Sequence, residues 1–411
     1  MTARPRPAPG ARRLSPVLLP TTVIGSYSVP EWLGQVRNDY YRHRISRRYL
    51  DEIHEMAIKA AVMDQQQAGI DIVSDGELRR DNDVDYLLAR IPGVEIPRPD
   101  KADYFDYYDA RLSQPLPAPG RANLGLAEDF RFVRQLTDRP VKLSLTGPYS
   151  LARRVRASAG EGGYADHADL VRALARVLSA EAAELARAGA RVLQIDEPFL
   201  AGYPEDIGLA IEAVNIVTEG ADVSWILHVC YGNRYARPLW EGHYDFLFPA
   251  VKEANVDQIA LEFARTGDED LSLLEEHHWD RGLGLGVIDV KTEQVESPDL
   301  VATRIRRALR YVPPERLVIN PDCGLRHLLP DIARAKLAAM VAGAAMVRAE
   351  IKPAAARPGA RKAASGPPAT SQPATDQPAT DQPATGPADG QRAGAGPVPG
   401  PAARPAVPSK G

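Results

Sequence analysis

The 411-residue chain has a formal net charge of −4, and its two ends differ in composition from the middle. Residues 1–17 and 352–411 each carry +4, which leaves −12 on the core between them and argues against a nucleic-acid groove. The longest strongly apolar stretch, 337–347, is too short to cross a bilayer, and no secretory signal precedes the core. We therefore expect a soluble, cytoplasmic protein that does not insert into membranes.

Both ends of the chain are predicted to be disordered. Residues 1–17 hold four arginines and four prolines but no apolar run, which is typical of a loose arm. Residues 352–411 are dominated by Ala, Pro, Thr and Gly and contain the repeat DQPATDQPAT, so they have little apolar surface to bury. One packed domain is expected over 18–351, and the alternative that the tail contacts an unknown protein as an extended ligand stays open.

Along the core, short apolar runs alternate with amphipathic helical stretches. The expected strands are 21–25, 71–75, 141–146, 191–196, 223–229, 258–262, 282–289 and 316–320. The expected helices include 49–68, 166–188, 205–217, 299–311 and 331–349. Eight such units predict an α/β fold, a closed (β/α)8 TIM barrel, with a doubly wound sheet as the alternative.

Residues 92–125 interrupt this alternation after the second expected strand. They are rich in proline and cluster the aromatic residues Tyr104, Phe105, Tyr107 and Tyr108. We expect an insertion that either covers the mouth of the barrel or forms a surface hairpin with its own aromatic cluster.

Chemically active residues gather where the expected strands end, which is the catalytic end of such a barrel. They are Asp75-Gly76-Glu77, Asp196-Glu197, His228-Val229-Cys230, Glu262, Asp289 and Asn320-Pro321-Asp322-Cys323-Gly324. Because side chains two apart on a strand share a face, His228 and Cys230 can reach one ion.

The closed barrel would bring Glu262 and Cys323 toward the same point. One imidazole, two thiolates and one carboxylate make a tetrahedral zinc shell, in which the carboxylate of Glu262 is the exchangeable ligand. Each of these residues alone is more often an ordinary buried side chain, but the chain has only these two cysteines, and their placement favours a metal. His327 is the alternative ligand.

Eight segments, in order, resemble the catalytic barrel of cobalamin-independent methionine synthase. They are TTVIGSY, VSDGELRRD, LTGP, LQIDEP, HVCYGN, LEFAR, GVIDVK and VINPDCGL, from Thr21 to Leu325. The resemblance implies Zn²⁺ on His228, Cys230, Glu262 and Cys323. The zinc would activate the thiol of homocysteine, which is methylated to methionine.

The resemblance also implies a site for the amino-acid part of the substrate. Its carboxylate would meet Gly25 and Ser26, while Glu77 and Asp196 would pair with its ammonium group. The alternative is that Glu77, Asp196 and Glu197 form a structural network of ion pairs below the site.

Departures from the family pattern lie on the methyl-donor side. After Asp289 the family has a histidine where this chain has Lys291, and an aromatic residue of the family is replaced near Arg154. Lys291 would supply a proton to the departing donor if its pKa were lowered by zinc or burial. Full-length members carry a second, N-terminal barrel, so a stand-alone catalytic half is expected, with methyl-folate or a methyl-corrinoid as donor.

Three other functions stay open. The first is a related zinc alkyltransferase that uses a different thiol or donor, including coenzyme M with an epoxide. The second is a barrel that binds zinc or a corrinoid without turnover. The third, more distant, is a metal-free hydrolase that uses the carboxylates of Glu77 and Glu197.

Overall fold

The computed structural model describes residues 15–96, 107–118, 123–156 and 163–351. The predicted tail, most of the predicted arm, and Tyr104 and Phe105 of the insertion lie outside these residues. Six parallel strands form the central sheet, in the order β3-β5-β6-β7-β8-β9. They are β3 (Lys142–Thr146), β5 (Val192–Asp196), β6 (Ser224–His228), β7 (Gln258–Leu261), β8 (Gly282–Gly286) and β9 (Leu317–Asn320).

Two further segments complete the ring as single parallel bridges. Thr21 pairs with Ile319 of β9, Thr22 pairs with Ile72, and Val73 pairs with Val141 beside β3. The segments predicted as the first two strands therefore occupy their expected places between β9 and β3. The second leaves the ladder after Val73, because the Gln65 side chain bonds both the backbone N–H and the carbonyl oxygen of Ser74.

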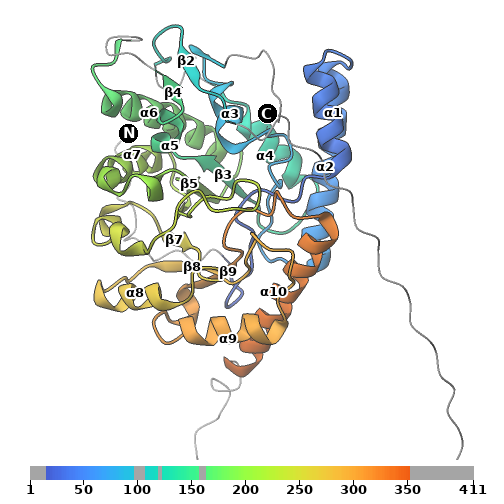
Figure 1. Cartoon of the computed structure of the whole chain (residues 1–411), viewed down its shortest axis with the longest axis vertical. Coiled ribbons are helices and arrows are strands. Elements are labelled where there is room, and N and C mark those ends of the chain that lie inside the picture. The colour runs from blue at the N-terminus through green and yellow to red at the C-terminus, as the bar shows by residue number, and fades with distance from the viewer. Residues whose placement is uncertain (1–14, 97–106, 119–122, 157–162, 352–411) are drawn as a thin grey trace, which may run out of the picture. The chain divides into compact units, whose positions relative to one another are not determined.

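Helices surround the strands, as Figure 1 shows, with α6 and α7 on one side of the sheet and α9 and α10 below it. The helices are α1 (Glu31–Tyr41), α2 (Arg47–Ala68), α3 (Asp83–Leu88), α4 (Leu126–Arg134), α5 (Pro148–Ala152), α6 (His167–Arg187), α7 (Ile207–Glu219), α8 (Ser272–Glu276), α9 (Pro298–Ala308) and α10 (Pro330–Ile351). The five predicted helices correspond to α2, α6, α7, α9 and α10, with ends within a few residues. This alternation confirms the predicted (β/α)8 architecture.

Capping residues explain where the long helices begin and end. The Ser46 hydroxyl accepts a hydrogen bond from the Tyr49 N–H at the start of α2, and Gly69 ends that helix with φ of 91°. Ser297 caps α9 in the same way, with Pro298 in the first helical position. These local signals fix the lengths of the crossovers and therefore where each strand end points.

All residues of β3, β6, β7 and β9 are buried, as expected for strands covered by helices outside and side chains inside the ring. Within the ring, Ile24, Val192, Ile226 and Ala260 form a small apolar cluster contributed by four different strand segments. The interior is therefore packed, and any binding space must lie at the strand ends.

The insertion forms a small sheet of its own. Strand β2 (Ala110–Leu112) pairs antiparallel with β1 (Val94–Glu95) and parallel with β4 (Val155–Arg156). Tyr107 leads from this sheet toward the barrel and packs edge-on against Phe199, with ring centroids 5.6 Å apart. Part of the insertion therefore reaches the end of the barrel where the strands terminate.

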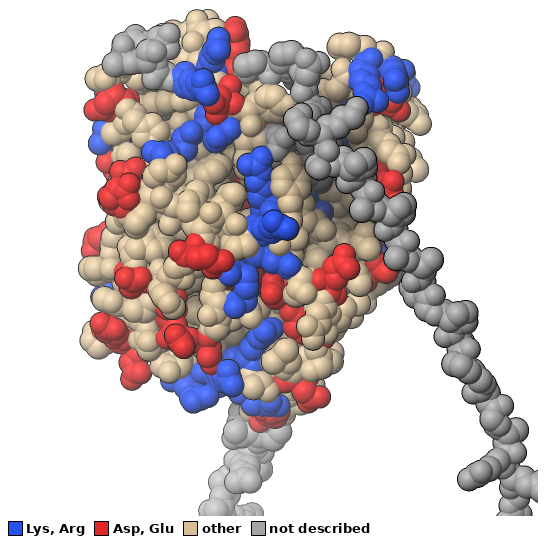
Figure 2. Space-filling view, viewed as in Figure 1, with Lys and Arg blue, Asp and Glu red and all other residues tan. Residues whose placement is uncertain are grey.

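Acidic and basic side chains are interspersed on the face shown in Figure 2. Among the described residues, no helix is both long and apolar enough to cross a membrane.

Candidate metal and substrate site

A cavity of about 90 Å³ lies at the carboxyl ends of the strands. Of the residues predicted for the site, the cavity is lined by Ser26, Glu77, Asp196, His228, Cys230 and Cys323. Gly25, Glu262, Asp289 and Lys291 lie outside the lining. The cavity therefore contains most of the residues predicted to bind the amino-acid part of the substrate and three of the four predicted metal ligands.

Three of the four predicted metal ligands come together. One ligand atom from each of His228, Cys230 and Cys323 lies within 4.8 Å of the other two. The two sulfur atoms are 3.6 Å apart, close to the roughly 3.8 Å expected for two thiolates about 2.3 Å from one tetrahedral zinc ion.

His228 is oriented for a ligand. Its Nδ1 is 3.0 Å from the Ala260 carbonyl oxygen, which places a ring proton on Nδ1, so Nε2 is the acceptor in the neutral form of the ring that binds a metal. Nε2 is buried and has no hydrogen-bond partner. Because an unpartnered buried nitrogen costs about 1–3 kcal/mol, this atom needs an electrophile, and a metal ion fits the need.

The two thiols differ in acidity. The hydrogen bond between the two sulfurs holds the pKa of Cys323 well below its usual range, and the nearby His228 lowers it further against the effect of burial. The same hydrogen bond, together with burial, raises the pKa of Cys230. Cys323 is thus the sulfur prepared to be a thiolate, which is the form that binds zinc. These residues fit a zinc ion.

Glu262, the fourth predicted ligand, is not part of the three-residue group. It is fully buried, and its Oε1 is 2.8 Å from the Lys291 ammonium. Its Oε2 has no hydrogen-bond partner, although the Arg265 Nε is 3.7 Å away. Burial raises the pKa of Glu262 to about 7 against the opposing charge of Lys291. One oxygen of Glu262 is therefore committed to Lys291, and the other has no bonded partner.

Asp289 positions Lys291 by accepting a hydrogen bond from its backbone N–H at 2.8 Å. Burial lowers the pKa of Lys291, but the charges of Glu262, Cys323 and Cys230 outweigh burial, so the pKa is raised. Proton donation by Lys291 was expected to need a lowered pKa, and the pKa of Lys291 is not lowered. Lys291 is a protonated ammonium tied to Glu262.

Glu77 lies in a buried ion-pair network on the opposite side of the cavity. Its carboxylate accepts a hydrogen bond from the Ser144 hydroxyl at 2.5 Å and lies 3.5 Å from guanidinium nitrogens of Arg80 and Arg326. Burial raises the pKa of Glu77, but the two arginines outweigh burial and leave it lowered. Glu77 is thus an ionised carboxylate that both lines the cavity and belongs to a structural network.

Asp196 ends β5 beside Glu77 and has no cation within ion-pair distance in the described part of the chain. Burial raises its pKa to about 7, although the charge of His228 acts in the opposite direction. The Gln194 amide donates to its Oδ1 at 2.6 Å. Lys142, lower in the barrel, donates to Gln194 instead, and burial lowers its pKa to about 7. A bound cation would therefore be more strongly attracted to Asp196 than to the already paired Glu77.

Gly25 and Ser26 lie where the first segment meets the loops of the site. A side chain at Gly25 would force the Glu77 carboxylate to move, because a Cβ there would lie 2.2 Å from the Glu77 Oε1. Ser26 lines the cavity, and a Cβ on Gly324 would lie 1.9 Å from its hydroxyl. Both glycines are therefore required by close approach of polar groups.

Glu197 has a structural role. It is fully buried, and its carboxylate oxygens accept the backbone N–H groups of Tyr149 and Ser150 at the start of α5. Glu197 does not line the cavity, so the pairing of Glu77 with Glu197 in a metal-free hydrolase lacks support from the geometry.

Several residues of the cavity were not predicted as site residues. They include Asn82, Asp83, Tyr107, Asn233 and Arg326. Tyr107 donates from its hydroxyl to Asp83 at 2.9 Å, which joins the insertion to α3. Arg326, three residues after Cys323, donates to the Arg80 and Asp81 carbonyl oxygens. Its position next to the DCGL motif was the available signal.

His327 lines the cavity but is outside the three-residue metal group.

Comparison with known proteins agrees with this geometry. Residues 19–346 match the family model described as the catalytic domain of cobalamin-independent synthase. A methionine synthase from Saccharolobus solfataricus is 37% identical over 337 residues, which cover 82% of this chain and 96% of that protein. One from Sulfurisphaera tokodaii is 35% identical over 336 residues, covering 82% and 94%.

Among solved structures, a B12-independent methionine synthase from Shewanella sp. W3-18-1, in complex with selenomethionine, superposes with a TM-score of 0.71 at 28% identity. The superposition covers 82% of this chain and all of that one. The family-model match, over residues 19–346, extends from the first bridge segment into α10 and includes the strand ends that form the cavity. The chain therefore belongs to the cobalamin-independent methionine synthase family of methyltransferases.

Proposed function

We propose that this protein is a zinc-dependent methionine synthase that transfers a methyl group from a methylated folate to the sulfur of homocysteine. The observation that carries the proposal is the convergence of the His228 imidazole and two cysteine sulfurs at the end of a barrel of this family. The Shewanella relative with bound selenomethionine supports methionine as the product.

His228, Cys230 and Cys323 would hold the zinc ion, with Glu262 as the fourth, exchangeable ligand. When bound, zinc lowers the pKa of a thiol so that it reacts as a thiolate near neutral pH. For Glu262 to take part, its carboxylate must turn from Lys291 toward the metal group. The Oε2 without a hydrogen-bond partner is the oxygen available for this.

The opposite side of the cavity would hold the amino-acid part of homocysteine. Asp196 would accept its ammonium group, because it is a buried carboxylate without a cation of its own, and Glu77 would add a second acceptor. The backbone at Gly25 and Ser26 would receive the substrate carboxylate. Binding at both ends would keep the sulfur next to the metal ligands and align it with the methyl donor.

On the donor side, Asp289 holds Lys291 near the metal group, and Lys291 would give a proton to the folate nitrogen that loses the methyl group. The substrate sulfur forms the new bond to carbon while the bond from that carbon to nitrogen breaks. The ion pair with Glu262 keeps Lys291 protonated and raises its pKa, so the proton becomes available for transfer once Glu262 turns from Lys291 to the metal.

The test is to measure zinc content and methionine formation together in matched histidine variants. We expect equimolar zinc in the wild type and loss of both zinc and methionine formation in His228→Gln. His327→Gln, which changes a cavity histidine outside the metal group, should keep its zinc. Full zinc and activity in His228→Gln would contradict the metal assignment. Turnover of other thiols, but not of homocysteine, would contradict the substrate.

A further inference from the structure

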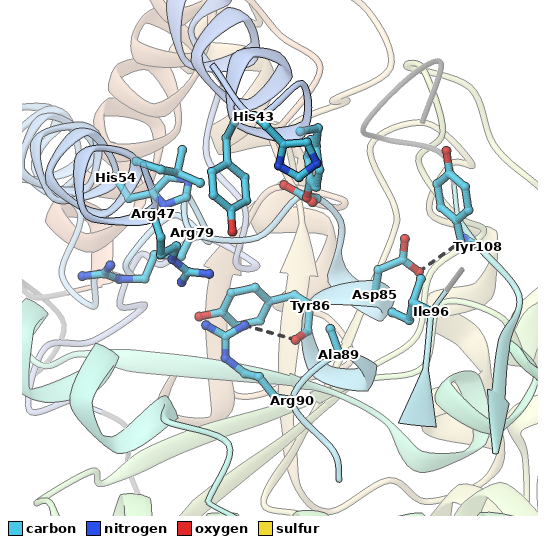
Figure 3. Close-up of a pocket in the computed structure, with 14 residues that line it drawn as sticks. His43, Arg47, His54, Arg79, Asp85, Tyr86, Ala89, Arg90, Ile96 and Tyr108 are labelled. Atoms are coloured by element: carbon cyan, nitrogen blue, oxygen red, sulfur yellow. Dashed lines mark hydrogen bonds between the residues drawn. The ribbon is translucent and has the colours of Figure 1, made fainter. Parts of the chain in front are cut away.

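A second cavity, of about 220 Å³, lies beside α1, α2 and α3, outside the site described above. The segment that leads into α3 separates the two cavities. Asn82 and Asp83 line the first, whereas Asp81 and Asp85 line the second. The second cavity is thus a space of its own, with walls that carry basic and aromatic side chains (Figure 3).

His54 of α2 is an unpartnered polar side chain in the wall of this cavity. It is only 4% exposed, and neither of its ring nitrogens has a hydrogen-bond partner. Burial lowers its pKa to about 2, and the charges of Arg37 and Arg79 add to this effect. The ring is therefore neutral and offers one N–H donor. Leaving it unbonded costs about 1–3 kcal/mol, which a ligand recovers once the ring turns one of its buried nitrogens toward the cavity.

Arg90 contributes a positive charge without a carboxylate partner. Its guanidinium lies over the Tyr86 ring, 3.6 Å from the centroid, and donates to the Tyr86 carbonyl oxygen at 3.4 Å. Among the residues that the structure describes, no carboxylate lies within ion-pair distance of it. Figure 3 shows Arg90 beneath Tyr86, on the side of the cavity across from His54.

Two of the other charged groups in the wall are acidic: Asp81 lies 3.8 Å from Arg37, and Asp85 accepts hydrogen bonds from the Asn82 amide and the Tyr108 N–H. Arg47 also lines the cavity, where its charge is shared with Asp51 at 2.9 Å, and Arg79 is paired with Asp129 at 2.9 Å. Leu50 and Ile96 supply apolar wall. These features together select a ligand with a charged end and an apolar body.

We propose that this cavity binds a small molecule that bears an oxyanion, either a carboxylate or a phosphate. Arg90 pairs with the oxyanion and His54 donates a hydrogen bond to the same molecule. The volume admits a molecule of roughly ten non-hydrogen atoms, smaller than a drug-sized ligand. This binding is separate from methyl transfer and requires neither zinc nor homocysteine.

The experiment is calorimetric titration of the full chain with benzoate and with phenyl phosphate, using phenol as the uncharged comparison. We expect at least one of the two anions to bind below about 10 mM, and phenol not to bind. The preference between the anions distinguishes a carboxylate ligand from a phosphate ligand.

Matched arginine variants test the location of binding. Arg90→Gln should weaken binding about tenfold or more, and Arg90→Lys should weaken it less because the charge is kept. Arg48→Gln, on the same helix as His54 but with a side chain that is 90% exposed and paired with Glu52, should bind as the wild type does. Circular dichroism verifies that each variant is folded. Absence of binding by both anions, or equal binding by folded Arg90→Gln, would overturn the proposal.

Discussion

Replacement of Lys291 by methionine tests whether Glu262 belongs to the metal site. The Lys291 ammonium and the Glu262 carboxylate are 2.8 Å apart, with side chains that are 4% and 0% exposed. At this separation and an effective dielectric constant of about 20, their attraction is roughly 6 kcal/mol. Because burial also removes the hydration of both groups, removing one partner costs about 3–5 kcal/mol. Arg265 remains 3.7 Å from the second oxygen, so we expect the lower end, about 3 kcal/mol.

The assay is urea unfolding of the metal-free chain under reducing conditions, followed by the same measurement with zinc. Without metal, Lys291→Met should lose about 3 kcal/mol of unfolding free energy, or roughly a hundredfold in the unfolding constant. If Glu262 binds the ion, zinc replaces the lost ammonium. The increase in stability caused by zinc should then exceed the increase in the wild type by up to about 3 kcal/mol.

Lys336 provides the matched control. Its ammonium is 2.9 Å from Glu296, and the two side chains are 0% and 6% exposed, so Lys336→Met removes a buried ion pair of similar length, together with hydrogen bonds to the Asp289 and Gln294 carbonyl oxygens. Its stability should fall without any additional stabilisation by zinc. If zinc stabilised Lys291→Met and the wild type equally, Glu262 would not be a ligand. If metal-free Lys291→Met were as stable as the wild type, the buried ion pair between Lys291 and Glu262 would not stabilise the fold.

Three further predictions concern other parts of the barrel. Asp196→Asn should raise the KM for homocysteine about 10- to 100-fold in initial-rate measurements and leave the zinc content unchanged, because only the ammonium acceptor is weakened. Glu181 accepts two backbone N–H groups at the start of α4, and burial raises its pKa above that of the unfolded chain. Since the folded state then holds the proton to higher pH, wild-type stability should fall as pH rises between the two pKa values, and Glu181→Gln should lose this slope in urea titrations. Gly25→Ala places a Cβ 2.2 Å from the Glu77 carboxylate, so it should cost about 1–3 kcal/mol of stability and abolish methionine formation, whereas Gly208→Ala, with no atom within 4 Å, should do neither.

The ring of strands could be predicted because parallel strands place their carboxyl ends at one edge. His228, Cys230 and Cys323 follow from this rule alone, since each stands at a strand end and the ring brings β6 and β9 to the same mouth. The extent of the first two strands could not be predicted. In the second, the Gln65 side chain bonds the backbone of Ser74 in place of a neighbouring strand, and the sequence pattern does not signal such a contact.

The ion-pair partners of the site residues could not be predicted from the sequence. Strand position placed Glu262 near the metal residues, but only packing shows that Lys291 holds one of its oxygens. In the same way, Arg326 was passed over although it follows the DCGL motif, because a long flexible side chain can reach many partners from one backbone position. Sequence periodicity gives the direction of a side chain from its element, and that direction says little about the end of an arginine or lysine.

Glu77 illustrates why the amino-acid side of the site depends on the whole ring. Its left-handed backbone is unfavourable by roughly 1–3 kcal/mol and persists only because neighbouring groups hold the carboxylate. Those neighbours are the Ser144 hydroxyl on β3, the Arg326 guanidinium after β9, and the bare backbone of Gly25. They belong to three segments that only a closed barrel brings together. The position of this proposed acceptor is therefore set by tertiary closure, whereas two of the proposed metal ligands, His228 and Cys230, are already placed by one strand.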